Sequence, residues 1–219
     1  MSTVDQRKYS ADETAKRIIR LTEGLTDFWT NPKSWAPIEA TELLTKSRLD
    51  WQVSIAKQLN LFLDVSKKES GLLILAWTTL GSLLEGSLKL FLSVHCKEFK
   101  MKSLIQKKDG KQAGPDELVL ENLRIFFANH VFPADAKKQW KDQGEINWIS
   151  WISKIQFKRN AIHAFKERDI GSMEEFHSEL QNYLIFLRKI NNGLPYPDEI
   201  YVPAEDFLDL SIEEVAFTG

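Results

Sequence analysis

The chain has 219 residues, 43% of them hydrophobic, and a formal net charge of −2, so its composition indicates neither intrinsic disorder nor a strongly basic nucleic-acid binder. Its single cysteine, Cys96, excludes an internal disulfide framework and is typical of a reducing cytoplasm. The N-terminal stretch lacks the apolar segment of a signal peptide, so we expect a cytoplasmic protein.

The first half of the chain has helical periodicity. Ser10 precedes Ala-Asp-Glu, which is typical of a helix start, and apolar residues recur at helical spacing until Asn31-Pro32. A second helix is expected from Pro37 to about Val65, with apolar positions that include Trp51. A third, from about Glu69 to Val94, is apolar nearly all round, as a central helix would be.

Two features of this third helix bear on its surroundings. The uncharged run Gly71–Leu84 is followed by Glu85 and Lys89, which leaves it too short to span a membrane, so we expect a buried core helix and no membrane association. Glycine in a helix interior weakens the helix by about 1 kcal/mol relative to alanine. Gly81 and Gly86 therefore predict that another helix approaches closely there.

Loops and shorter helices are expected next. Lys107–Pro115 has the composition of a loop, and the lysine-rich region Lys97–Lys111 is either solvated or contacts a phosphate backbone. A short helix should begin at Pro115 and reach about Val131, because proline suits the first helical position. The polar stretch Pro133–Gly144 is expected to mix turn and helix.

Two further helices are expected, at about Glu145–Phe165 and Met173–Asn191, separated by Gly171-Ser172. From Leu194 onward there are seven acids and no lysine or arginine, and this tail is expected to be extended or loosely packed. We therefore predict a single-domain all-α protein. Residues 1–66 would be N-terminal helices packed on a helical core formed by 67–193, and 194–219 an acidic tail.

The helix expected at 145–165 carries the residues most suggestive of chemistry. Trp148, Ile152, Ile155, Arg159, Ile162 and His163 follow one stripe at spacings of three and four, which would place Arg159 and His163 on the buried face. A buried guanidinium needs a partner, either a carboxylate, for which Glu85 is the candidate, or a bound phosphate. Arg159 and His163 together could bind a phosphate and transfer a proton beside it.

The segment Arg159-Asn160-Ala161-Ile162-His163-Ala164-Phe165 resembles the signature of the HEPN superfamily. Two further pieces look similar to helical HEPN proteins, namely Leu80–Phe91 and the long helix from Met173. The resemblance covers roughly residues 69–192. It implies a HEPN-like helical bundle, often homodimeric, with the motifs of both copies facing a shared cleft.

Many members of this superfamily are metal-independent endoribonucleases of toxin–antitoxin and phage-defence systems. The resemblance thus implies an RNA substrate, a homodimer, an antitoxin or defence partner protein, and no metal or cofactor; DNA is not expected. His163 would be the general base or acid at the ribose 2′-hydroxyl or the leaving oxygen. Arg159 would hold the scissile phosphate, with Asn160 orienting one of the two and Glu85 in support.

Basic residues flank the motif, and they would give a positive field around bound RNA. They are Lys154, Lys158, Lys166 and Arg168. The pattern departs from the family in one respect, because about four to six residues usually separate the arginine and the histidine, and here three do. Lys158 restores a gap of four, but lysine lacks the planar guanidinium fork. The alternative is a catalytically inactive HEPN-like module for protein interaction or RNA binding.

Overall fold

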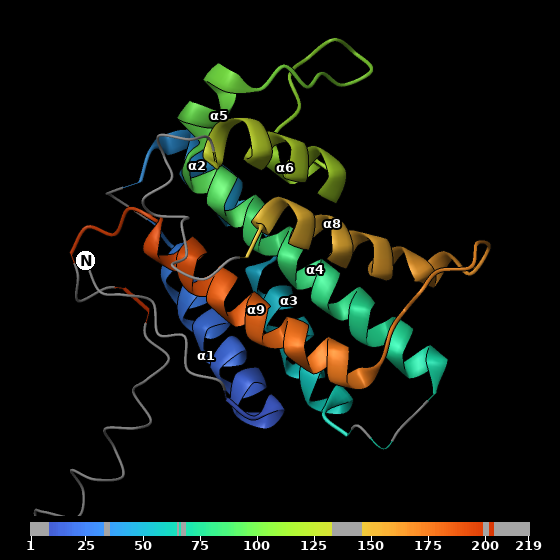
Figure 1. Cartoon of the computed structure of the whole chain (residues 1–219). Coiled ribbons are helices and arrows are strands. Elements are labelled where there is room, and N and C mark those ends of the chain that lie inside the picture. The colour runs from blue at the N-terminus through green and yellow to red at the C-terminus, as the bar shows by residue number, and fades with distance from the viewer. Residues whose placement is uncertain are drawn as a thin grey trace, which may run out of the picture.

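The computed structural model describes residues 9–32, 36–64, 66, 69–132, 146–198 and 202–203, and within them the chain is all-α (Figure 1). The α-helices are α1 (Ala11–Trp29), α2 (Ile38–Lys46), α3 (Leu49–Lys57), α4 (Ser70–Val94), α5 (Cys96–Lys102), α6 (Leu120–Phe126), α8 (Trp148–Arg159) and α9 (Met173–Asn192). Tighter 3₁₀ turns are η1 (Gln58–Phe62), η2 (Pro115–Glu117) and η4 (Asn160–His163), and η3 (Phe127–Val131) is a wider π-helical turn.

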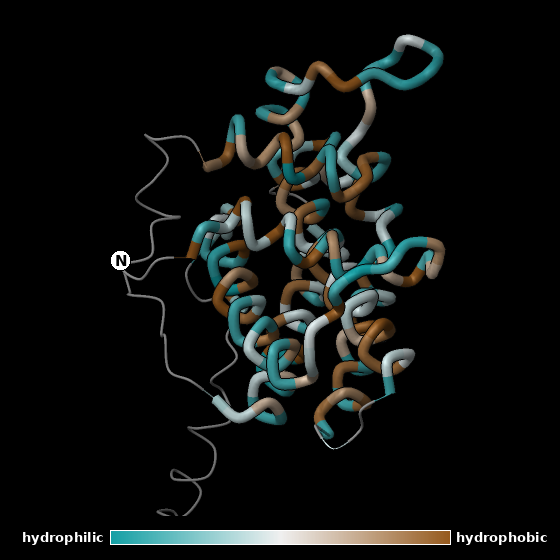
Figure 2. Tube along the Cα trace, turned by 45° about the vertical axis from the view of Figure 1, so that its right-hand side comes forward, coloured by the Kyte–Doolittle hydropathy of each residue, from teal (hydrophilic) through white to brown (hydrophobic). Residues whose placement is uncertain are grey.

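Helix α4 is the centre of the bundle, and α2, α3, α8 and α9 all pack against it. Its largest buried side chain, Trp77, is fully buried and donates a hydrogen bond of 2.8 Å from Nε1 to the carbonyl of Ile170. By length and composition α4 could cross a membrane, but half of its most apolar window is buried within the fold, so it is weak evidence either way. Figure 2 shows hydrophobic and hydrophilic residues alternating along the surrounding helices.

Helix α1 begins and ends close to where the sequence predicts. The Ser10 hydroxyl accepts a hydrogen bond from the Glu13 N–H at 3.2 Å, which satisfies one of the free donors of the first turn. The apolar side of the helix, with Ile18 and Trp29 fully buried, packs against α3 and α9. Side chains of α1 to α3 join those of α4 to α9 in one hydrophobic cluster, so the N-terminal helices share the core of the bundle.

The single helix expected at 37–65 is wrong, because the chain breaks between α2 and α3. Ser47 is extended, with ψ 152°, and its N–H and hydroxyl both bind the carbonyl of Leu44, closing α2. Trp51, expected on the apolar row, is 57% exposed. The Arg48 guanidinium lies 4.2 Å from the centre of its ring instead.

The segment from 96 to 132 also differs from the expectation. Residues Cys96–Lys102 form helix α5, which the sequence analysis did not predict. Pro115 opens only a three-residue 3₁₀ turn, and α6 and the π-helical η3 follow as a separate element. The loop at 107–115 is confirmed; its tip is closed by a hydrogen bond of 2.7 Å from the Lys107 N–H to the Lys111 carbonyl.

The start of the C-terminal segment is packed, which corrects the expectation of a loose tail for these residues. The Tyr196 hydroxyl donates to Asn191 Oδ1 at 2.5 Å and accepts from Trp29 Nε1 at 3.2 Å. Pro203 lies against Gly24 of α1, and its carbonyl accepts a hydrogen bond from Asn191. The other expectations for the tail and those for 133–144 lie outside the described residues. The helix expected from about Glu145 begins at Trp148, later than the sequence predicts.

Two glycines of α4, Gly81 and Gly86, lie where neighbouring helices come closest, as the sequence predicts. A Cβ built on Gly81 would lie 2.6 Å from Arg159 Cδ and 2.9 Å from Arg159 Cβ, too close for any real contact. A Cβ on Gly86 would overlap the side-chain amide of Gln52, from α3. Glycine at these two positions therefore lets α8 and α3 approach the backbone of α4.

Replacing Gly81 by alanine should destabilise the fold by about 1–3 kcal/mol, because the stem of Arg159 would have to move. Gly71→Ala is the matched control in the same helix. A Cβ there meets nothing within 4 Å, so it should be stabilising by up to about 1 kcal/mol through helix propensity. Urea unfolding of both variants measures the difference, and equal stability would contradict the close approach of α8.

Candidate functional site

Helix α8 is fixed in place by its aromatic side. Asn147 begins the helix, with its side chain accepting a hydrogen bond of 3.1 Å from the Ser150 N–H. Trp148 and Trp151 are buried, and each packs on Phe186 of α9 with ring centres 5.2 Å and 5.4 Å away. Ile152 and Ile155 are fully buried as well, so the predicted buried stripe is confirmed for the first part of the helix.

The stripe ends where the motif begins. After Arg159 the chain tightens into the 3₁₀ turn η4, which is closed by Ala164 in a left-handed conformation with φ 52°. A 3₁₀ turn has about 3.0 residues instead of about 3.6, so successive side chains rotate further round the axis. Ala161 is consequently buried, whereas Ile162 and His163 are exposed, and the expectation that His163 shares the buried face of Arg159 is wrong.

Arg159 is held by the carboxylate that the sequence singles out. Its Nη1 donates to Glu85 Oε2 at 2.7 Å, while Glu85 Oε1 pairs with Lys89 Nζ at 2.9 Å. The Arg159 and Glu85 side chains are 28% and 19% exposed, and the aliphatic part of Arg159 lies over Gly81. The guanidinium is thus fixed in orientation, because one of its terminal nitrogens is bound to a carboxylate of α4.

The other two motif residues are less constrained. Asn160 ends α8 through its backbone, its N–H bonding to the Gln156 carbonyl, and its side chain is half-buried. The His163 imidazole is exposed. Within the described part of the chain, neither of these two side chains has a hydrogen-bond partner. Both can therefore meet a ligand without first breaking an internal bond.

Two of the lysines expected to contact RNA are already paired with carboxylates of α9. Lys158 is 4% exposed, with its Nζ 2.9 Å from Glu175 Oε2 and 5.0 Å from the centre of the Trp77 ring. Lys154 bridges Glu175 and Glu179 at 2.8 Å and 2.6 Å. We call these four charged residues the α8–α9 ionic ladder. Because their charges balance, they add little to a positive field at the motif.

Burial and pairing act in opposite directions within the ladder. Burial raises the pKa of Glu175, but hydrogen bonds from Lys154 and Lys158 outweigh it, and the pKa lies below its ordinary value. For Lys154, burial lowers the pKa, but the bonds to Glu175 and Glu179 raise it above its ordinary value. Both shifts favour the charged forms, so Lys154 and Glu175 are ionised at neutral pH.

The remaining basic residues follow the motif turn. Lys166 is exposed, and the Arg168 guanidinium lies 4.8 Å from the centre of the Phe157 ring. Gly171, with φ 67°, leaves room for the Lys158–Glu175 pair, since a Cβ there would lie 2.7 Å from Lys158 Nζ. Lys166 is thus open to solvent, whereas Arg168 is partly buried.

Apolar side chains are exposed beside His163, which the sequence pattern did not reveal. Phe157 is 45% exposed, Ile162 44%, and Phe165 102%. We call these three residues the motif-end patch. The helical pattern predicted a buried Ile162, and only the change from α-helix to 3₁₀ turn brings it to the surface.

Among the residues that the structure describes, no group of three or more histidine, cysteine, aspartate and glutamate side chains could hold a metal ion. No family model, curated protein or solved structure matches the chain. The site is therefore interpreted from its own geometry.

Glu175→Gln should lower the free energy of unfolding at neutral pH, because both lysines of the ladder lose a charged partner. Since the folded-state pKa of Glu175 lies below its ordinary value of 4.5, its contribution is present above that pH and disappears as the pH falls below it. Urea unfolding should show wild type and variant converging in acid. Glu167→Gln, on an exposed residue of the following segment, should match wild type throughout.

Proposed function

We propose that this chain is a HEPN-like, metal-independent endoribonuclease of a bacterial toxin or phage-defence system, acting on RNA in the cytoplasm. The observation that carries the proposal is the combination at the motif. A guanidinium is fixed by Glu85, and an exposed imidazole with no described hydrogen-bond partner follows one short turn later. Catalysis of phosphoryl transfer by side chains needs a positioned charge and a proton carrier.

In this proposal Arg159 binds the scissile phosphate with the part of its fork that Glu85 leaves free. His163 takes the proton of the ribose 2′-hydroxyl, and the 2′-oxygen attacks phosphorus as the bond to the 5′-oxygen breaks. That oxygen needs a proton in turn, and His163 of a second copy would donate it. The products are a 2′,3′-cyclic phosphate and a 5′-hydroxyl. Asn160 was expected to orient Arg159 or His163, but its side chain bonds to neither within the described chain, so we assign it to the substrate. Lys166 and Arg168 contact the RNA backbone.

A homodimer is part of the proposal because one exposed imidazole cannot be base and acid in the same step. The motif-end patch supports it, since its three apolar side chains are exposed on the described chain and two of them, Ile162 and Phe165, lie within two residues of His163. Pairing of two patches would bring the two motifs together. An antitoxin or defence-system protein could occupy the same surface and keep the two copies apart.

A second candidate is a catalytically inactive HEPN-like module that binds RNA or protein. The pairing of Arg159 with Glu85 and the balanced charges of the ionic ladder favour it, because both supply the partners that a structural role requires. The three-residue spacing between Arg159 and His163 also favours it. The two candidates differ in whether RNA is cleaved.

RNA cleavage in excess EDTA tests the enzymatic proposal. Wild type should cleave and leave cyclic phosphate ends, whereas His163→Ala should lose about 100-fold or more in rate, because it removes the proton carrier. Arg159→Lys should also be impaired, since lysine keeps the charge but lacks the fork. Arg20→Ala, on α1, is the matched control and should cleave as wild type does.

Each variant is first shown to melt as wild type does, so that loss of activity is not loss of fold. Cleavage by folded His163→Ala at the wild-type rate would contradict the proposed chemistry. A folded wild type that binds RNA or a partner without cleaving it would establish the second candidate.

The proposed dimer has its own test. Phe165→Ser should shift the protein from a dimer toward a monomer of 25.3 kDa in sedimentation, because the most exposed residue of the patch becomes polar. Leu104→Ser is the control, since Leu104 is 93% exposed but belongs to the segment after α5. A monomeric wild type, or equal effects of the two changes, would contradict pairing through the motif-end patch.

A further inference from the structure

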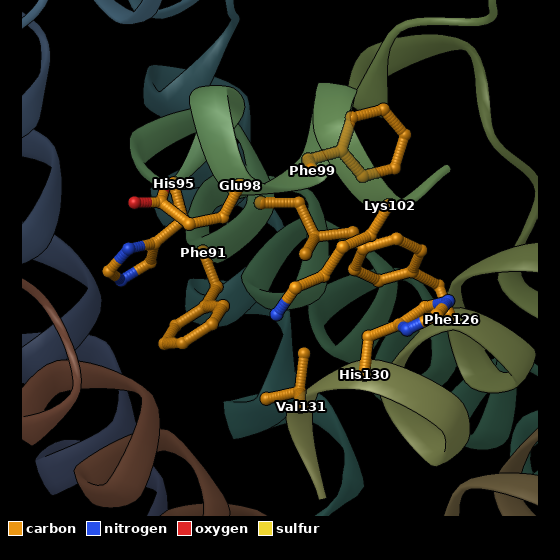
Figure 3. A pocket seen from close by; sticks show the side chains of 9 residues that line it. Phe91, His95, Glu98, Phe99, Lys102, Phe126, His130 and Val131 are labelled. Atoms are coloured by element: carbon orange, nitrogen blue, oxygen red, sulfur yellow. The ribbon is translucent and has the colours of Figure 1, made fainter. Parts of the chain in front are cut away.

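A separate cavity of about 180 Å³ lies between the C-terminal end of α4, helix α5 and the α6–η3 segment (Figure 3). No residue of α8 or of the motif turn lines it. Its walls include Phe91, Leu92, Phe99 and Phe126, all nearly buried in the fold. Its opening is bordered by charged and titratable side chains, so it combines an apolar interior with a polar mouth, as small-molecule sites do.

The size of the cavity limits what it can hold. An apolar cavity of about 150 Å³ in another protein accepts benzene, so this one has room for a single six-membered ring with a short substituent. Larger ligands would extend into solvent. The aromatic walls would stack on or meet the edge of such a ring.

The mouth favours an anion. In Figure 3 the Lys102 side chain crosses the cavity and ends between Phe91 and Val131, while the His130 ring lies on the Phe126 side. Lys102 has no ion pair within the described residues, although Glu98 lies one turn earlier on the same helix. The His130 ring packs on Phe126 with ring centres 4.7 Å apart, and the described chain gives it no hydrogen-bond partner.

The two other polar residues that line the cavity, His95 and Glu98, lie on the side opposite Phe126. His95 is bound through Nε2 to the carbonyl of Gly193 at 3.1 Å, so it is already occupied. Glu98 appears on the His95 side of the cavity in Figure 3, opposite Phe126 and His130. An anion in the cavity can therefore pair with the Lys102 ammonium, which has no ion pair within the described residues.

The backbone at this cavity is unusual as well. His130 and Val131 belong to the π-helical turn η3, which ends with a hydrogen bond of 2.9 Å from the Phe132 N–H to the Phe127 carbonyl. Such turns are rare, and they occur frequently at functional sites because the extra residue redirects a side chain. Here the turn places His130 in the wall of the cavity, with its ring against Phe126.

We infer that this cavity binds a small aromatic carboxylate, with its ring among the phenylalanines and its carboxylate held by Lys102. The inference is independent of the proposed ribonuclease, because it uses none of the motif residues.

Amide NMR titration of the full chain with phenylacetate tests it. Binding should occur with a dissociation constant on the order of 1 mM and perturb residues of α5 and η3. The neutral analogue 2-phenylethanol and inorganic phosphate should each bind about fivefold more weakly or worse, since one lacks the charge and the other the ring.

Three variants locate the site. Lys102→Met should weaken phenylacetate binding about fivefold, while Lys100→Met, on the same helix but outside the cavity, should not. Val131→Trp should abolish binding by filling the cavity, provided that its melting shows a folded protein. Equal binding of acid and alcohol, equal effects of the two lysine changes, or no binding up to about 20 mM would each overturn the inference.

Discussion

The close contact between α4 and α8 at Gly81 is the constraint on which the rest of the structure depends. It brings the stem of Arg159 onto the backbone of the central helix and places the guanidinium within reach of Glu85. Without that approach, a charged side chain on the inner side of α8 would lack a partner in an apolar environment. The absence of a side chain at Gly81 thus determines both the packing of α4 against α8 and the orientation of Arg159.

The sequence was sufficient for the parts of the fold that rest on local signals. Ser10 and Ser172 cap helices through their hydroxyls, and the uncharged run of α4 is central, because capping and periodicity act over a few residues. It failed at the break after Ser47 and at helix α5. There the decisive interactions are hydroxyl bonds to the preceding turn and the burial of Cys96 and Phe99, which periodicity does not encode.

The candidate site shows the same division. The pairing of Arg159 with Glu85 followed from the need of a buried cation for a carboxylate. The exposure of His163 did not follow, because the sequence gives no sign that the α-helix tightens at Asn160. Nor did the pairing of Lys154 and Lys158 with α9, since the register between two helices is a tertiary property. The sequence of α8 alone does not show which of its lysines face solvent and which are paired with carboxylates of a neighbouring helix.

Helix α9 has a mechanical consequence for the motif. Its 20 residues form a rod roughly 30 Å long. Glu175 and Glu179 hold α8 near one end, and Asn191 bonds Tyr196 and Pro203 at the other. An axial displacement of the rod would therefore strain both sets of bonds together. A displacement of the C-terminal segment along the axis of α9 would therefore be transmitted to α8, the helix that carries Arg159.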